Sequence, residues 1–209
     1  GLTVVFFFSD TATTEIYTLS LHDALPIYLA NIGTPGFKRE LAIMSARPAE
    51  AIERGAPSET NSINNLGGGV SMNETMTDFS KGAFRTTGNK EDFAIAGEGF
   101  FHVDDNGEKF LTRAGNFHIS PKGELVTEQG FNVLTESGDP LTITTPDYRL
   151  ESDGGILQFG ELSFLALVRP KSMGDLVKVG QNLFRPLGDV DLIPRGERHV
   201  LGNTLELSS

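Results

Sequence analysis

The sequence predicts a mainly β protein, a hairpin-rich antiparallel β-domain with little helix. From residue 92 onward, short aromatic or β-branched stretches alternate with turn signals at regular spacing, which favours an all-β module over βαβ units. Asn106-Gly107 is a strong hairpin signal, because both residues tolerate a positive φ. The chain also reaches Ser209 without a long terminal helix pattern.

The first half of this region alternates strands with two turns. Turns are expected at 104–107, around Asn106-Gly107, and at 120–123. The strands expected around them are 92–96, 99–103, 109–113, 116–119 and 124–127.

Gly97, Gly99, Phe100 and Phe101 form a motif with a structural meaning of its own. Two glycines remove side chains where chain segments approach closely or bend. Successive strand residues point to opposite faces, so one phenylalanine ring fills the core and the other faces a second layer or a partner. Two core aromatics in a bent sheet are the simpler alternative.

The later chain continues the pattern. The apolar run 162–168 is expected to form a central strand, and 172–179 a loose helical turn. A tight reversal is expected at 153–155. The other strands expected here are 141–144, 149–151, 156–159, 184–187 and 199–207.

Residues 1–28 differ from the rest of the chain. They contain no Lys or Arg, their apolar run is too short for a secretory signal, and no apolar 3.6-residue stripe is visible. The segment resembles translated sequencing-adapter DNA. We therefore expect it to be non-native; a divergent N-terminal tail is the alternative, and no function is assigned to it.

Residues 29–69 are expected to hold a turn that leaves a helix, followed by a flexible connector, with the β-rich core domain at 70–209. Pro35-Gly36 suits the two centre positions of a type II turn. A short helix is expected at 48–54. The three glycines at 67–69 lack the Gly-Lys-Ser/Thr of a phosphate-binding loop, so a connector is the better interpretation.

Composition excludes several function classes. The formal net charge is −11, which argues against a nucleic-acid partner. The absence of cysteine excludes disulfides, thiol nucleophiles and Cys-ligated metals. No apolar run approaches the roughly 20 residues of a membrane-spanning helix, so no membrane insertion is expected.

No catalytic, cofactor or metal site is expected. The four histidines form no metal-binding motif, although His102 and His118 lie on predicted strands that could face each other. The acidic turn before Gly107 lacks the ligand spacing of a calcium loop. A pair of carboxylates for glycoside hydrolysis stays open, since its separation is a three-dimensional property.

Several ordered motifs resemble the bacterial flagellar basal-body rod and hook protein family. The resemblance covers residues 29–209 and fits rod subunits better than the longer hook protein. Each motif alone is weak, and their order and spacing carry the resemblance. The motifs are Leu29-Ala30-Asn31, Thr34-Pro35-Gly36-Phe37-Lys38, 78–89, 92–101, 112–117 with 123–130, Gly180-Gln181-Asn182-Leu183-Phe184 and Leu205-Glu206-Leu207-Ser208.

The resemblance implies a non-enzymatic structural subunit of the periplasm-spanning rod, which transmits torque by self-assembly. It implies assembly with other rod and hook subunits, and passage through the flagellar export apparatus without a cleaved signal peptide. The family's two Asn before the Leu-Ala-Asn element and its terminal helices have no counterpart here. We therefore expect a truncated chain that carries mainly the β-domain and is mostly monomeric.

The residues expected to matter are structural. They comprise a turn from helix to β-domain and a bend that fixes the sheet, with Asn31 in the family signature before the turn. Two other functions stay open: a secreted β-domain that binds carbohydrate or a cell surface, and a hydrolase. The expected structural residues are Asn31, Thr34, Pro35, Gly36, Phe37, Gly97, Gly99, Phe100 and Phe101.

Overall fold

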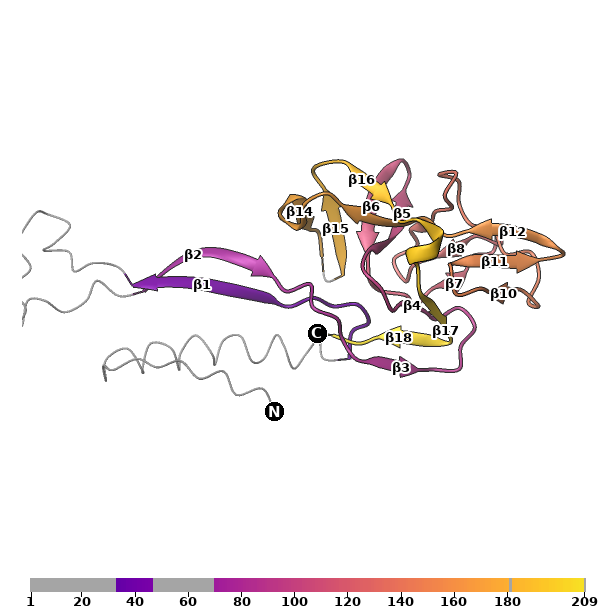
Figure 1. The fold of residues 1–209 in the computed structure, drawn as a ribbon, viewed down its shortest axis with the longest axis horizontal. Coiled ribbons are helices and arrows are strands. Elements are labelled where there is room, and N and C mark those ends of the chain that lie inside the picture. The colour runs from indigo at the N-terminus through magenta and orange to yellow at the C-terminus, as the bar shows by residue number, and fades with distance from the viewer. Residues whose placement is uncertain (1–32, 47–69, 181, 209) are drawn as a thin grey trace, which may run out of the picture. The chain divides into compact units, whose positions relative to one another are not determined.

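The computed structural model describes residues 33–46, 70–180 and 182–208. These residues form two compact units, one within Arg39–Asp78 and the other from residues 33–38 together with 79–208. The described elements are strands and two short 3-10 turns, joined by loops (Figure 1). The predicted mainly β, antiparallel fold is confirmed.

The first unit contains one hairpin. Strand β1 (Glu40–Ala46) pairs antiparallel with β2 (Val70–Thr77), with a register shift between Ile43 and Met44. At its base the amide of Asp78 donates to the carbonyl of Arg39 (2.9 Å), and the Arg39 guanidinium pairs with the Asp78 carboxylate (2.7 Å). Strand β1 has no counterpart among the strands expected from the sequence. The sequence around β1 shows no clear alternation, and its pairing with a segment about 30 residues away is not a local signal.

The second unit holds the remaining strands, which are short. In chain order they are β3 (Phe84–Thr86), β4 (Phe93–Ile95), β5 (Phe100–Asp105), β6 (Glu108–Thr112), β7 (His118–Ile119), β8 (Leu125–Val126), β9 (Asn132–Val133), β10 (Arg149–Leu150), β11 (Gly155–Gln158), β12 (Glu161–Phe164), β13 (Leu167–Pro170), β14 (Leu176–Lys178), β15 (Leu183–Pro186), β16 (Val190–Leu192), β17 (Val200–Gly202) and β18 (Thr204–Glu206).

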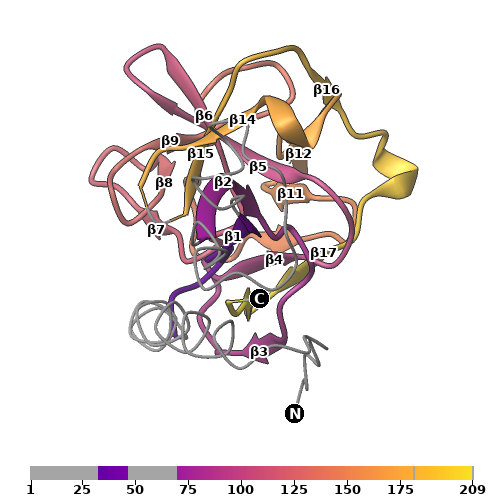
Figure 2. The same ribbon diagram turned by 90° about the vertical axis from the view of Figure 1, so that its left-hand side faces the viewer.

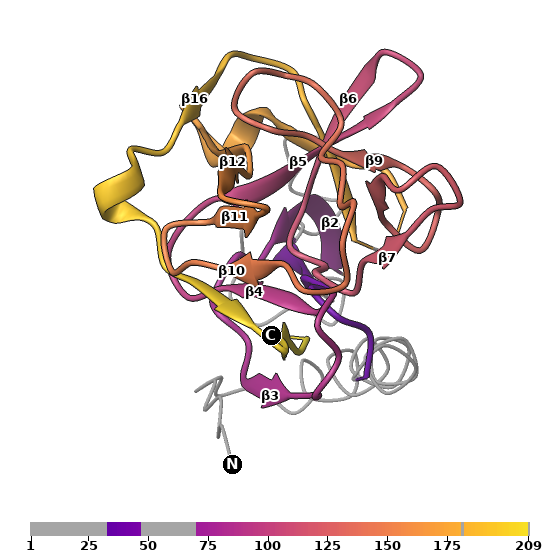
Figure 3. The same cartoon turned by 90° about the vertical axis from the view of Figure 1, so that its right-hand side faces the viewer.

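The main sheet of this unit has the strand order β14-β15-β6-β5-β9-β8-β7, and β13 joins it by pairing with both β5 and β16. Three smaller sheets complete the unit: β10-β11-β12, β17-β4 and β18-β3. Strands β14 and β15 lie on the side of the unit that faces the viewer in Figure 2. Strands β10, β11 and β12 lie on the opposite side, which faces the viewer in Figure 3. All pairings within these sheets are antiparallel.

The turn chemistry agrees with the sequence. Asn106 (φ 51°) and Gly107 (φ 99°) both lie in the left-handed region between β5 and β6, as the Asn-Gly pair predicts. Gly123 donates to the carbonyl of Ser120 (2.8 Å), and Gly154 donates to that of Glu151 (3.0 Å). Local residue chemistry is therefore sufficient to place these reversals.

The apolar run 162–168 is not one central strand. It divides into β12, in the small β10-β11-β12 sheet, and β13, in the main sheet. Between them the amide of Ala166 donates to the carbonyl of Leu134 (2.8 Å), so the chain changes sheets there. A continuous apolar run has no period-2 pattern, and periodicity cannot locate such a break.

Three other expectations need correction. Residues 141–144 form no ladder; Thr142 makes an isolated bridge to Glu124. The turn predicted within 172–179 shrinks to a 3-10 turn (Met173–Asp175), capped by the Ser172 hydroxyl and followed by β14. Strands β3, β9 and β16 have no counterpart among the expected strands. The helix predicted at 48–54 and the segments 1–28 and 55–69 lie outside the described residues.

Two hydrophobic clusters lie on opposite faces of β5. Phe101 and Val103 belong to the main core, with Leu125, Ile156 and Leu165 among others. Phe100 faces the second cluster, whose buried members are Leu111, Val168 and Phe184. In the described part of the chain, no helix has the length and apolar character needed to span a bilayer.

Candidate functional site: a buried ionic junction

Lys38, Arg113 and Glu206 form a buried cluster, called here the junction cluster. It joins the segment before β1 to the C-terminal strand β18, which is 168 residues away in sequence. The Lys38 ammonium lies 2.7 Å from Glu206 Oε1, and both side chains are about 1% exposed. Lys38 Nζ also donates to the carbonyl of Ser80 (2.7 Å). An ion pair this deeply buried survives only when hydrogen bonds satisfy its atoms.

Arg113, directly after β6, completes the cluster. Its Nη1 lies 3.3 Å from Glu206 Oε2 and 3.0 Å from the carbonyl of Ile95, and its Nη2 donates to the carbonyl of Gly97 (3.0 Å). Burial lowers the pKa of Arg113, while the nearby Glu206 carboxylate opposes that shift. The guanidinium carbon also lies 5.5 Å from the centre of the Phe100 ring. One side chain thus connects β4, β5 and β18.

Backbone groups at two glycines also bind Glu206. The amide of Gly82 donates to its carboxylate (3.0 Å), and the amide of Gly36 donates to its main-chain carbonyl (2.9 Å). A Cβ on Gly82 would overlap the carbonyl oxygen of Leu207, and a Cβ on Gly36 would overlap the backbone at Ala114. Gly36 also has a positive φ of 64°. Both positions therefore require glycine for close backbone approach.

The predicted turn at 34–37 lies beside this cluster. The amide of Phe37 donates to the carbonyl of Thr34 (3.3 Å), which closes the turn around Pro35 and Gly36 as predicted. Phe37 is buried, and the Lys178 ammonium lies 4.5 Å from its ring centre. Lys178 Nζ also donates to the carbonyl of Lys38 (2.9 Å). Asn31, the remaining residue predicted here, lies outside the described part.

The second predicted group, Gly97, Gly99, Phe100 and Phe101, lies at the start of β5 and just before it. Gly99 (φ 104°) leaves no room for a Cβ, which would overlap Ile193 Cδ1 and approach the carbonyl of Val168. Gly97 is different: a Cβ there would meet only the carbonyl of Glu197, at 3.8 Å. Crowding therefore explains why residue 99 is glycine but not why residue 97 is. The observed contact of Gly97 is the hydrogen bond that its carbonyl accepts from Arg113.

The structure places the two predicted groups around one set of charges that the sequence did not identify. Lys38, Arg113 and Glu206 each follow or lie within a recognised motif, but neither charge pattern nor spacing singles them out. Charged side chains are usually solvated. The available signal was an apolar neighbour beside each charge, and these neighbours, Phe37, Ala114 and Leu205, are buried in the structure.

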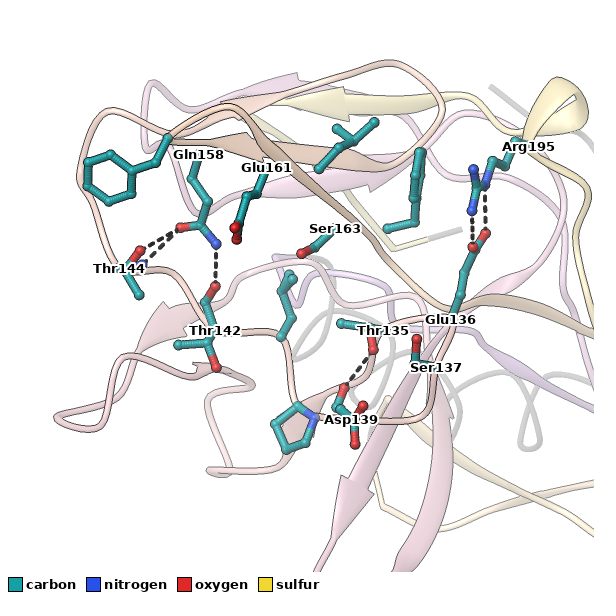
Figure 4. Close-up of a pocket in the computed structure, with 15 residues that line it drawn as sticks. Thr135, Glu136, Ser137, Asp139, Thr142, Thr144, Gln158, Glu161, Ser163 and Arg195 are labelled. Carbon is teal, nitrogen blue, oxygen red and sulfur yellow. Dashed lines mark hydrogen bonds and ion pairs between the residues drawn. The ribbon is translucent and has the colours of Figure 1, made fainter.

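A surface groove of about 620 Å³ lies between the β11–β12 hairpin and residues 135–144 (Figure 4). Two of its polar side chains, Gln158 and Glu136, bind neighbouring groups. Gln158 accepts from Thr144 and donates to the carbonyl of Thr142. Glu136 pairs with Arg195 and with the buried Arg198 (2.6 Å each), and these contacts, the Arg195 hydrogen bond foremost, lower the pKa of Glu136. The described groups stabilise the loops around the groove.

Metal chemistry finds no support in the described residues, which hold no cluster of three or more potential His, Asp or Glu ligands. His102 lies opposite Leu111 and His118 opposite Val126, on different pairs of strands, so the two do not form a cross-strand pair. Burial, together with the positive charge of Lys109, lowers the pKa of His102. The predicted strand positions of both histidines are confirmed.

Comparison with known proteins gives a consistent result. Residues 94–161 match the family model described as flagellar hook protein FlgE/F/G D1 domain. The chain is 33% identical over 190 residues to the flagellar basal-body rod protein FlgF of Caulobacter vibrioides, covering 87% of this chain and 73% of that protein. It is 32% identical over 178 residues to FlgG of Bacillus subtilis, covering 78% and 66%. The matches thus span about two thirds to three quarters of these relatives.

Proposed function

We propose a function on one premise: this chain belongs to the flagellar basal-body rod protein family, whose members are structural subunits and not enzymes. Its function is that of a rod subunit in the flagellar basal body. The observation that carries this conclusion is the 33% identity across 87% of the chain, together with a β fold of the kind the family resemblance implies.

The finer proposal concerns how the subunit acts. A rod that transmits torque needs blocks that keep their shape under load, and a closely packed interior with few voids transmits strain. The junction cluster connects the segment before β1 to β18 through buried side chains, although the two segments lie far apart in the sequence. We assign Gly36, Gly82 and Gly99 the role of permitting the close backbone contacts on which this rigidity depends.

The partners follow from the same proposal. The subunit assembles with further copies and with other rod and hook subunits, in the periplasm-spanning part of the basal body. It reaches that place through the flagellar export apparatus without a cleaved signal peptide. The proposed domain division, with a non-native segment at 1–28, a turn and connector at 29–69 and a β-rich core at 70–209, also stays a proposal.

A chimaera tests this function. Residues 29–209 replace the matching stretch of the Caulobacter rod protein, in a strain that lacks the native gene, and swimming and rod formation are measured by motility assay and electron microscopy. The chimaera should restore rods. The same chimaera with Gly99→Val should be exported but fail to form rods, because valine meets Ile193 and the Val168 carbonyl. An exported and folded chimaera that forms no rods would contradict the proposed function.

A further inference from the structure

The β10-β11-β12 sheet presents an apolar outer face. Ile156 on β11 is fully buried in the main core, so its alternating neighbour Leu157 points to the opposite face. Leu157 is half-buried and lies directly opposite Leu162 of β12, and Leu162 is 48% exposed. The outward positions of an antiparallel sheet with one buried face are normally polar. These two leucines break that pattern.

The hairpin tip beside them carries Phe159, whose side chain is 82% exposed. Gln158 pairs with Glu161, so Phe159 (φ 49°) and Gly160 (φ 82°) form the two-residue turn. Turns with two positive φ values favour Asn, Asp or Gly at the first position, and phenylalanine is disfavoured there. Neither packing against the described residues nor turn preference explains this residue. Burial against a second molecule would account for it.

A neighbouring ring on the same face shows the contrast. Phe164 pairs with Gly155 across the hairpin and lies on the same face as Leu162. The Arg195 guanidinium covers it, with its carbon 3.5 Å from the ring centre. Phe164 is thus half-buried by its own chain, while Phe159 and Leu162 remain open to solvent. We call Leu157, Phe159 and Leu162 the hairpin surface.

Charge identifies a complementary region on the same chain. Residues 134–164, which include the hairpin, contain six Asp or Glu and only one Arg. Residues 79–86, which include β3, contain Lys81 and Arg85 and no acidic residue. Farther along the chain, Lys90 donates to the carbonyl of Pro146 and is followed by Glu91 and Asp92. All three residues of β3 are exposed, including Phe84 at 41%. In Figure 3, β3 lies at the lower edge of the second unit, apart from β11 and β12.

We propose that the hairpin surface of one copy docks on the β3 segment of a second copy, with Phe159 as the central buried contact. The inference rests on the proposed function and specifies which surfaces meet. Two different surfaces in contact make a heterologous interface, which builds a ring or an open helical assembly and not a two-fold dimer. Acidic residues around the hairpin and basic residues around β3 orient the approach.

The contact is small and relies partly on exposed charges. Aromatic residues dominate the energy of such interfaces when they become buried, whereas rim charges mainly affect the rate of association. We therefore expect isolated chains to associate only transiently, and more slowly at high salt, because salt screens exposed charges.

Cross-linking of the full chain tests the contact directly, since the chain contains no cysteine. Glu161→Cys, beside the hairpin tip, and Thr86→Cys, on β3, leave Phe159 in place, and both positions are exposed. The two variants are mixed with a short bis-maleimide, and mixed dimers are quantified by mass spectrometry. The matched control replaces Glu161→Cys with Asn106→Cys, an exposed tip of a different hairpin.

Mixed dimers should form at least about tenfold faster than in the control, and more slowly in 0.5 M salt. Adding Phe159→Ser to the Glu161→Cys chain should reduce the rate to that of the control. Glu161→Cys chains that cross-link mainly to each other would show a symmetric contact and overturn the inference. A mixed-dimer rate equal to the control would also overturn it. If the chimaera still forms rods in either case, the proposed function stands and only this contact is wrong.

Discussion

Replacing Glu206 with glutamine tests whether the junction cluster stabilises the β unit. The substitution preserves side-chain shape but removes the negative charge that Lys38 and Arg113 share. Lys38 would remain a cation at about 1% exposure without a carboxylate beside it. The glutamine NH2 would also face a donor, either Arg113 or, if the amide is turned over, Lys38 and the Gly82 amide.

The structure allows the magnitude to be estimated. Removing one partner of a buried ion pair costs about 3–5 kcal/mol, because the remaining charge stays desolvated. With a typical urea dependence of about 2 kcal/mol per molar, the midpoint of unfolding should fall by about 1.5–2.5 M. Adding Lys38→Met to Glu206→Gln removes one orphaned cation, so it should recover at least about 1 kcal/mol.

Urea unfolding followed by circular dichroism measures these shifts. The matched control is Asp189→Asn, which breaks the exposed pair with Lys171 and should cost less than about 1 kcal/mol. If Glu206→Gln costs no more than Asp189→Asn, the junction cluster does not stabilise the fold and the reasoning above is wrong.

Three further predictions address backbone packing, pH and a buried hydroxyl. Gly82→Ala should lower the free energy of unfolding by about 1–3 kcal/mol, because the added Cβ overlaps the Leu207 carbonyl. The control Gly196→Ala places its Cβ in open space and should change the free energy by less than about 0.5 kcal/mol. Equal urea midpoints for the two variants would contradict this prediction. Because burial lowers the pKa of His102 in the folded state, the unfolded chain binds more protons as the pH falls below about 6.5, so acidification lowers stability. His102→Gln should reduce the loss measured between pH 7.5 and 5.5, and an unchanged loss would exclude this residue as its cause. The Tyr148 hydroxyl is buried and has no hydrogen-bond partner among the described residues, and burial raises its pKa. Tyr148→Phe should therefore leave the free energy of unfolding unchanged or raise it by up to about 1 kcal/mol. A clear decrease would show that the hydroxyl is hydrogen-bonded.

Local chemistry in the sequence determined much of this fold. Asn106-Gly107 specifies its hairpin because few residue pairs accept two positive φ values, and Pro35-Gly36 specifies its turn for a related reason. The alternation of Phe100 and Phe101 predicted one ring in the core and the other facing a second layer or a partner, and the two rings lie in separate clusters. These features depend on residues close in sequence, so they can be recognised without the tertiary structure.

Part of the candidate site could also be predicted. Gly36 and Gly99 were identified from their motifs, and each lies where a Cβ would overlap another part of the chain. Of the two reasons predicted for Gly97, close approach does not apply, because that position is not crowded, and a bend stays a prediction. The glycines at 82 and 115 are at least as constrained but lie in no turn signal that distinguishes them. Which atoms surround a glycine depends on distant segments.

By itself, the sequence determined a mainly antiparallel β protein, its principal turns and, through ordered motifs, its family. Only the tertiary structure decided that Lys38, Arg113 and Glu206 meet in the interior, and that the apolar run 162–168 divides between two sheets. Turn conformation and strand alternation arise from neighbouring residues. A buried charge is stable only where distant segments supply its counter-charge and hydrogen bonds, and composition or spacing along the chain does not encode that placement.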